Sequence, residues 1–344
     1  YFSEQGSLIW SEPRGTYAGY DWPQYSINRG DLQMLLYKEL IRLAGPSTVK
    51  TNAALKTWEN SSGEIELTLV DRKSNTLIEK KIATTVIGCD GINSTIRAKL
   101  YPNEGSANWS GIMMWRGTTK GPKFLSGQSM AMVGQRNQKF VAYPIYEFAD
   151  GQVLINWICD LKFPDDHLWT KQDWNMKGEL VDLWPSFKNW TFPWLDVASV
   201  IKNTRDIYKY PMVDRNPLNR WTFDNITLLG DAAHAMYPIG SNGASQAILD
   251  SAHLARCLER YGSSRDALRH YEKIRRVSVN KIVETNRLDG PDKILDIVAK
   301  KAPNGFENIN DVMPHEEMKQ IAKKYKVIAG FDADTLNSSN IIME

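Results

Sequence analysis

The chain has 344 residues, of which 42% are hydrophobic and 24% are charged, a composition typical of globular proteins. Its 42 Lys and Arg residues nearly balance 40 Asp and Glu residues, so charge favours neither nucleic acid nor an anionic membrane as a partner. No apolar stretch approaches the ~20 residues of a membrane-spanning helix. The three cysteines, Cys89, Cys159 and Cys257, are far apart. This spacing argues against a disulfide framework and for a reducing compartment, so we expect a cytoplasmic location.

The first hundred residues predict a loop, a helix and several strands. Residues 1–26 are rich in Gly, Pro and Tyr and read as loop and short strand. Leucines recur at helical spacing between Leu32 and Leu43, before Gly45-Pro46. Strands are expected at 53–59, 64–70, 77–82 and 84–87, and a short helix is expected at 94–100.

An antiparallel sheet is predicted next. Alternating stretches occur at 112–116, 129–134, 139–144 and 153–159. Residues 161–204 carry amphipathic helical patterns that are interrupted by Pro185 and Pro193. The patterns lie around five tryptophans, Trp169, Trp174, Trp184, Trp190 and Trp194. A returning strand is expected at 207–212.

An α/β pattern then resumes. A buried strand is expected at 226–229, followed by helices at 243–261 and 264–287. Residues 291–325 are helical and charged. The order of elements therefore predicts an α/β protein in which an antiparallel insertion splits one domain.

The first chemical motif is Gly230-Asp231, at the end of the predicted strand 226–229. A carboxylate at the C-terminal end of a strand lies where open α/β sheets bind ligands. Asp231 could accept hydrogen bonds there from sugar-like hydroxyl groups.

The loop after Asp231 strengthens this prediction. Its small residues permit close backbone approach to a ligand: Gly240, Gly243 and Ala244. The helix that follows begins with unpaired N–H groups and a positive dipole end, which favour negative charge. An ordinary strand–loop–helix capped by Asn242 or Ser241 is the alternative, but the whole run through Pro238 favours a ligand site.

The second motif is Gly88-Cys89-Asp90-Gly91, followed by Ser94 and Arg97. Ser94 is suited to cap the short helix. Asp90 and Arg97 could pair with each other or reach a pyrophosphate. Taken alone, Asp90-Gly91 is only a turn signal.

Together the two motifs resemble the downstream signatures of class A flavoprotein aromatic hydroxylases, which have the p-hydroxybenzoate hydroxylase fold. The separation of the motifs, with a strand-rich insert between them, is also similar. Trp115-Arg116-Gly117 and the run from Met236 to Gly243 resemble the phenazine-carboxylate and salicylate hydroxylase branch most closely.

The resemblance implies four segments: an FAD-binding domain at 1–105 and 213–290, a substrate-binding antiparallel sheet with helices at 106–212, and a C-terminal helical region at 291–344. The family also begins with a strand–GxGxxG–helix unit that this sequence lacks, so the sequence reads as part of a longer protein.

The resemblance further implies roles for individual residues. Asp231 would bind the ribityl hydroxyls of FAD, and Arg29 would reach the FAD from the start of a helix. Asp90, with Gly91, would contribute to FAD binding and to the transient approach of NAD(P)H. The flavin ring would be lined by the loop residues Pro238, Gly240, Asn242, Gly243 and Ala244.

The implied reaction is hydroxylation of an aromatic or heteroaromatic ring by NAD(P)H and O₂, through a flavin C4a-hydroperoxide. No metal and no certain catalytic side chain is required, and His234 is interpreted as a core histidine. Candidate pocket residues are aromatic or cationic: Trp115, Arg116, Tyr143, Trp157 and Tyr237. For each of them ordinary packing is the alternative.

Other outcomes stay open. The same flavin frame serves epoxidases, Baeyer–Villiger enzymes and NAD(P)H oxidases. The absent GxGxxG unit also leaves open a flavin-free remnant that acts as an interaction module. The protein is expected to be a monomer or a homodimer.

Overall fold

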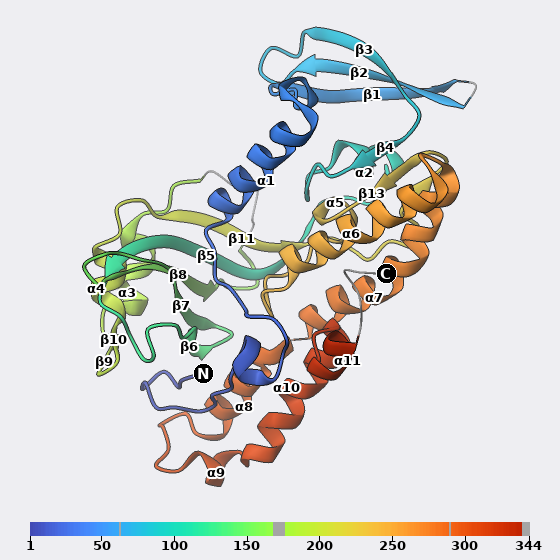
Figure 1. The fold of residues 1–344 in the computed structure, drawn as a ribbon. Helices are drawn as coiled ribbons and strands as arrows, with labels where there is room; N and C mark the ends of the chain where they lie inside the picture. The colour runs from blue at the N-terminus through green and yellow to red at the C-terminus, as the bar shows by residue number, and fades with distance from the viewer. Residues whose placement is uncertain (62, 168–175, 289, 339–344) are drawn as a thin grey trace. The chain divides into compact units, whose positions relative to one another are not determined.

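The computed structural model describes residues 1–61, 63–167, 176–288 and 290–338, and the chain divides into two compact units (Figure 1). Unit 1 consists of Tyr1–Asn28, Trp109–Met212 and Asp289–Glu344, and unit 2 consists of Arg29–Asn108 and Val213–Leu288. The predicted α/β class, with an antiparallel insertion and C-terminal helices, is confirmed. Unlike the four predicted segments, this division places the first 28 residues with the insert.

Unit 2 contains two three-stranded sheets and several helices. In chain order its elements are α1 (Arg29–Ala44), η2 (Pro46–Thr48), β1 (Ala53–Ser61), β2 (Glu64–Asp71), β3 (Leu77–Ala83), β4 (Val86–Gly88), α2 (Thr95–Leu100), β12 (Thr222–Phe223), β13 (Ile226–Leu228), α5 (Asp231–His234), α6 (Gly243–Tyr261) and α7 (Arg265–Arg287). The predicted strands and helices of this part of the chain are all present.

The two sheets of unit 2 differ in strand direction. β1, β2 and β3 form an antiparallel meander. In the second sheet, of order β12-β13-β4, β13 pairs with β4 in parallel although more than a hundred residues separate them. This parallel pair requires the chain to leave after β4 and to return before β13, which is where the antiparallel insert lies in the sequence.

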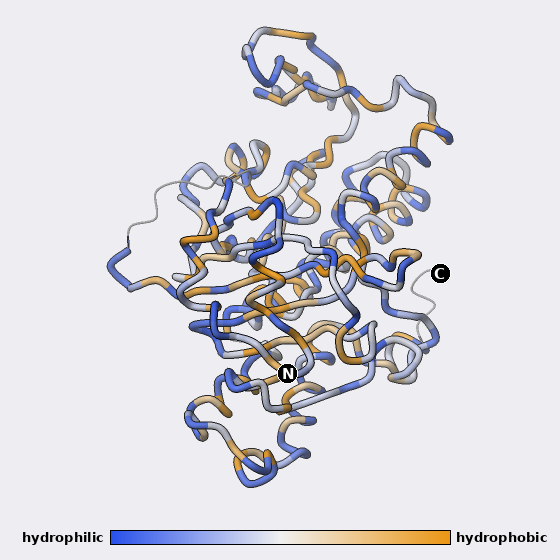
Figure 2. The backbone as a smooth tube through the Cα atoms, turned by 90° about the vertical axis from the view of Figure 1, so that its left-hand side faces the viewer, coloured by the Kyte–Doolittle hydropathy of each residue, from blue (hydrophilic) through white to orange (hydrophobic). Residues whose placement is uncertain are grey.

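Helices α6 and α7 cover a shared core in unit 2. α7 buries residues at spacings of three and four, including Leu268, Tyr271 and Val279, as expected for an amphipathic helix. Ser264 caps its start by accepting a hydrogen bond from Ala267 N at 3.2 Å. In Figure 2 hydrophilic and hydrophobic residues alternate along the helical turns. Tyr271 and Trp221, both buried, anchor the core between α7 and the sheet.

Unit 1 is built on a five-stranded antiparallel sheet of order β11-β5-β8-β7-β6. Its elements are η1 (Gly15–Ala18), β5 (Asn108–Gly121), β6 (Ala131–Gln135), β7 (Gln138–Glu147), β8 (Val153–Lys162), α3 (Leu180–Phe187), β9 (Thr191–Phe192), β10 (Leu195–Asp196), α4 (Val197–Lys202), β11 (Tyr208–Asp214), η3 (Gly290–Asp292), α8 (Lys293–Lys301), α9 (Ile309–Val312), α10 (His315–Ala329) and α11 (Ala333–Ser338). The first residue of β5, Asn108, and the last two residues of β11, Val213 and Asp214, are assigned to unit 2.

Each face of this sheet carries its own hydrophobic core. Side chains alternate between the two faces along a strand. Trp115, Phe140 and Trp157 pack on one face with residues of α3 and α4. Met132 and Val141 pack on the other face with residues of α8 and α10. Both faces of the sheet are therefore covered, in part by the C-terminal helices.

One sequence prediction is wrong. The helical pattern expected around Trp190 and Trp194 is a two-strand hairpin, in which Leu195 pairs with Phe192. Pro193 lies in the turn, where its fixed φ and missing N–H are tolerated. Trp169 and Trp174, assigned to the same pattern, lie outside the described residues. None of the helices that the structure describes is long and apolar enough to cross a membrane.

Candidate flavin site and its supporting network

Both sequence motifs lie at one edge of the parallel strand pair in unit 2. Gly88 of β4 is opposite Leu228 of β13, and Leu229 N donates to Gly88 O at 2.9 Å. Because parallel strands end at the same edge, the loops that carry Asp90 and Asp231 leave the sheet side by side. This is the edge at which open α/β sheets bind ligands.

Ser94 caps helix α2 as expected, by accepting a hydrogen bond from Arg97 N at 2.9 Å, and Asp90 reinforces the start of the helix. Its carboxylate accepts hydrogen bonds from the backbone N–H of Thr95 at 2.7 Å and of Ile96 at 3.3 Å, and from the hydroxyl of Ser94. The following Gly91 has φ +77°, a conformation that favours glycine. Asp90 is exposed but its oxygens are engaged, so its first role in this structure is to start α2.

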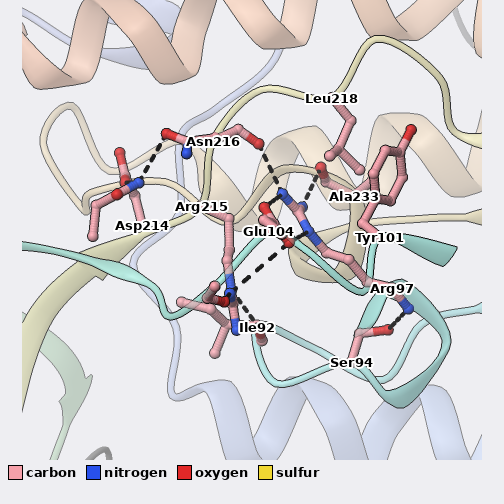
Figure 3. Close-up of polar contacts among 12 residues, drawn as sticks. Ile92, Ser94, Arg97, Tyr101, Glu104, Asp214, Arg215, Asn216, Leu218 and Ala233 are labelled. Carbon is pink, nitrogen blue, oxygen red and sulfur yellow. Dashed lines mark hydrogen bonds and ion pairs between the residues drawn. The ribbon is translucent and has the colours of Figure 1, made fainter. Parts of the chain in front are cut away.

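Arg97 ties the two loops together. Its buried guanidinium donates to Ala232 O at 3.1 Å, to Ala233 O at 2.9 Å and to the carboxylate of Glu104 (Figure 3). It also donates to Asn216 O at 2.7 Å. Of the two possibilities left open by the sequence, the pairing of Arg97 with Asp90 does not occur, because the guanidinium is bound instead to Glu104, to Asn216 and to the carbonyl groups of α5.

A small hollow of about 140 Å³ beside Arg97 is also structural. Arg215 on its rim donates to Ile92 O at 3.2 Å and to Gly105 O at 2.7 Å, and lies 3.9 Å from the carboxylate of Glu104. Burial lowers the pKa of Arg215, while Glu104 opposes the shift. The cations of this hollow therefore already have protein partners.

Asp231 contrasts with Asp90. It is the first residue of α5 and is exposed, and among the described residues no hydrogen bond or ion pair to its side chain occurs. Gly230 before it has φ +63° and ψ −142°, a backbone conformation available to glycine. The glycine turn thus presents a carboxylate that is available to a ligand.

A buried network of charged residues holds the Gly230 turn in place through a hydrogen bond to its backbone. Asp250 of α6 accepts hydrogen bonds from Gly230 N at 3.1 Å, from Arg275 Nε at 2.8 Å and from the ring of His234. Arg275 also donates to Gln246 Oε1 at 2.7 Å. Burial opposes ionisation of Asp250, but His234 and Arg275 outweigh it and lower its pKa.

The interpretation of His234 as a core histidine is confirmed, since its exposed fraction is 1%. Asp250 and Arg275 were not identified from the sequence. The available signal was the helical spacing of α6. Gln246 and Asp250 lie on the same buried side of the helix as Leu254 and Cys257, so two polar residues stand where apolar ones are expected.

The loop before α6 is open to a ligand. Pro238 and Ala244 are exposed, and Gly240 and Gly243 are half-buried. Gly240 has φ +79°. Asn242 is buried at the start of α6, and its side chain makes no capping hydrogen bond, so the first N–H groups of this 19-residue helix are not used by that side chain.

Arg29 is the first residue of α1 and is exposed. Among the described residues, no hydrogen bond or ion pair to its side chain occurs. Tyr237 also belongs to unit 2, where it is buried, and its carbonyl accepts from Asn286 Nδ2 at 3.2 Å.

The other pocket candidates belong to unit 1 and fall on opposite faces of its sheet. Trp115 and Trp157 are almost completely buried against α3 and α4, and Trp157 Nε1 donates to Thr204 Oγ1 at 2.8 Å. This environment favours packing for both tryptophans. Arg116 and Tyr143 are half-buried on the other face.

Arg116 lies beside a buried ionic cluster. Lys139 of β7 contacts Asp292 of η3 and lies 3.3 Å from Asp160 of β8. Burial raises the pKa of Asp160, against the opposing charges of Lys139 and Arg116. Burial alone would lower the pKa of Lys139, but Asp292 and Asp160 reverse that effect and raise it.

Comparison with known proteins identifies the family to which the chain belongs. The family model described as "FAD binding domain" matches residues 24–286. The chain is 40% identical over 290 residues to phenazine 1,6-dicarboxylic acid hydroxylase PhzS of Lysobacter antibioticus, covering 83% of this chain and 71% of that protein. It is 28% identical over 275 residues to 3-amino-4-hydroxybenzoate 2-monooxygenase PtnB3 of Streptomyces platensis, covering 79% of this chain but 64% of that protein.

Solved structures share the fold. CtdE in complex with FAD and its substrate 4 has a TM-score of 0.70 at 19% identity, covering 96% of this chain and 80% of that one. A salicylate hydroxylase substrate complex has a TM-score of 0.62 at 18% identity, covering 91% and 76%. The resemblance seen in the two motifs is thereby confirmed, and the chain belongs to the FAD-binding-domain family, among the FAD-dependent aromatic monooxygenases.

Proposed function

We propose that the full-length protein hydroxylates an aromatic or heteroaromatic carboxylic acid, with NAD(P)H and O₂ as co-substrates and FAD as the cofactor. The single observation that carries the proposal is Asp231, an exposed carboxylate without a side-chain partner among the described residues, held by a glycine turn at the carboxyl edge of the parallel strands. Membership of the FAD-binding-domain family supports it.

FAD, when bound, would transfer electrons from NAD(P)H to O₂ and place one oxygen atom on the ring. The balance is one ring C–H, one O₂, one NAD(P)H and one proton, giving a ring C–OH, NAD(P)⁺ and water. The protein would bind the FAD and the aromatic substrate, orient them and exclude water. Asp231 would hold the ribityl hydroxyls, while the loop of Pro238 and Gly240 would lie against the flavin ring, with the start of α6 facing negative charge.

A carboxylated substrate is proposed for two reasons. The relative at 40% identity is named as a hydroxylase of a phenazine dicarboxylic acid. Arg116 also offers a planar guanidinium, half-buried on the sheet face opposite Trp115, and such a group binds carboxylates through paired hydrogen bonds. Tyr143 lies on the same face, where it packs against the core to which α8 and α10 contribute.

The cofactor assignment is tested by titrating FAD into wild-type protein and into Asp231→Ala. We expect the substitution to weaken FAD binding by tenfold or more. Asp266→Ala is the matched control, since Asp266 is an exposed aspartate in the first turn of α7 and should leave affinity unchanged. Equal affinity of wild type and Asp231→Ala would overturn the role of Asp231.

The reaction is tested by mixing the flavin-loaded protein with NADH or NADPH without oxygen. The visible absorbance of oxidised flavin should bleach faster when a phenazine carboxylate or a hydroxybenzoate is present. Admission of O₂ should then yield a hydroxylated ring. Acceleration by neutral ring compounds alone would contradict the carboxylate preference, and no bleaching under any condition would contradict the monooxygenase.

A further inference from the structure

A second site is suggested by a groove in unit 2 that none of the flavin motifs touches. The α7 groove has a volume of about 510 Å³ and lies between α7 and the segment that leads into β12. The charged residues lining it are Arg220, Arg265, Arg269, Glu272, Lys273 and Arg276. It contains no residue of the loops that follow β4 and β13.

The basic residues of α7 share one side of the helix. Arg265, Arg269, Lys273 and Arg276 are separated by four, four and three residues, and residues at these spacings are neighbours on a helix surface. This basic side is distinct from the positions of Leu268, Tyr271 and Val279, which are buried in the core. Arg220 adds a fifth cation from the opposite wall.

Protein carboxylates neutralise only part of this charge. Glu272 accepts from Arg276 Nε at 2.9 Å and from Thr222 N at 2.8 Å, so its capacity is used inside the groove wall. Asp224 pairs with Arg265 at 3.2 Å. Five cationic side chains thus face two carboxylates.

Two of the cations have no protein partner. Among the residues that the structure describes, neither Arg269 nor Lys273 forms a hydrogen bond or ion pair through its side chain, and both are exposed. They lie one helical turn apart, about 6 Å along the axis. Uncompensated cations at this spacing repel each other, and an anion that bridges them would relieve the repulsion.

We propose that the α7 groove binds a small molecule that carries two or more linked phosphate groups. Guanidinium groups bind phosphate oxygens through paired hydrogen bonds, and a lysine ammonium adds a point charge. A volume of about 510 Å³ exceeds the space that one phosphate needs and falls within the range of small-ligand pockets. Linked phosphates can contact Arg269 and Lys273 and extend to the other cations that line the groove, whereas a single phosphate is too small to reach them all.

The test is calorimetric titration of the wild-type chain with inorganic tripolyphosphate, with inorganic pyrophosphate, with ADP and with citrate, at constant ionic strength. The double variant Arg269→Gln/Lys273→Gln should bind tripolyphosphate at least tenfold more weakly. Lys319→Gln/Lys323→Gln is the matched control, because these exposed residues have the same spacing on α10. Thermal unfolding should show that both double variants remain folded.

The outcomes separate the possible sources of the phosphate. Tighter binding of ADP than of inorganic pyrophosphate would identify a nucleotide as the ligand, and equal binding would identify the phosphate groups alone. Either result supports the site. The proposal is overturned if wild type shows no saturable binding, if citrate binds as tightly as tripolyphosphate, or if the α10 variant loses as much affinity as the α7 variant. None of these outcomes depends on flavin binding.

Discussion

The guanidinium of Arg97 donates to the carbonyl oxygen of Ala233 at 2.9 Å, although 136 residues separate them in the sequence. This bond joins the helix of the first motif to the helix of the second. The two loops that would hold the cofactor are therefore positioned by one buried side chain. The same residue contacts neither the exposed carboxylate of Asp231 nor that of Asp90.

Replacing Arg97 by Met should destabilise unit 2 strongly, because Glu104 and three carbonyl groups would lose their donor in a buried site. Breaking one partner of a buried ion pair costs about 3–5 kcal/mol. Denaturant unfolding monitored by tryptophan fluorescence measures the loss. Arg42→Met is the control, since Arg42 pairs with Glu39 on the exposed surface of α1, and it should unfold as wild type does. A similar loss in both variants would refute a special role for Arg97.

Gly230 and Gly243 should respond to alanine in opposite ways. Gly230 has φ +63° and ψ −142°, so Gly230→Ala should cost about 1–3 kcal/mol of stability through backbone strain. Gly243 begins α6, and an added Cβ would meet only Met236, at 3.7 Å, so Gly243→Ala should be neutral or stabilise by up to about 1 kcal/mol. Thermal unfolding distinguishes them. Equal melting temperatures would contradict the proposed strain at Gly230.

Asp250 should contribute stability that acid removes. Its folded-state pKa lies below the ordinary value because the effects of His234 and Arg275 outweigh burial. The contribution is therefore complete above the unfolded pKa of about 3.9, and it is lost as pH falls through the folded pKa. The difference in unfolding free energy between wild type and Asp250→Asn should be constant at neutral pH and shrink below about pH 4. A difference that does not vary with pH would show that ionisation of Asp250 is irrelevant.

Lys139 should contribute strongly to the stability of unit 1. Lys139→Met would leave the carboxylates of Asp160 and Asp292 buried without their cation, at a cost of about 3–5 kcal/mol. Because η3 leads into α8, limited proteolysis should cut the C-terminal region of this variant first. Lys123→Met, which removes an exposed partner of Glu147, should digest like wild type. Unchanged protection of α8 from proteolysis in Lys139→Met would show that the ion pair of Lys139 with Asp292 does not hold the C-terminal region in place.

Much of the fold could be predicted because its signals are local. The strands of both antiparallel sheets and the helices α1, α6 and α7 follow from hydrophobic periodicity. The hairpin of β9 and β10 could not be predicted in this way. Its segment is short, and the aromatic residues on either side of Pro193 have a spacing that also fits a helix.

The candidate site divides in the same way. Asp90 and Asp231 stand out because a strand end, a glycine and a carboxylate are adjacent in the sequence. Arg97 also bonds to Ala232, and Lys139 also bonds to Asp292, more than a hundred residues away in each case, and no local pattern indicates partners at such a distance. Trp115 and Trp157 show the complementary problem, because a pocket aromatic and a core aromatic have the same pattern in one sequence.

Helix α1 contains no buried residue, and Leu35 and Leu43 are 64% and 69% exposed. An isolated helix of 16 residues is only marginally stable in water, because packing normally supplies most helical stability. The backbone amides of α1 should therefore exchange with deuterium orders of magnitude faster than those of α7, which buries eight residues. In this chain α1 would fray and re-form while the α6–α7 core stays closed, so deuterium uptake would separate the two helices within a single experiment.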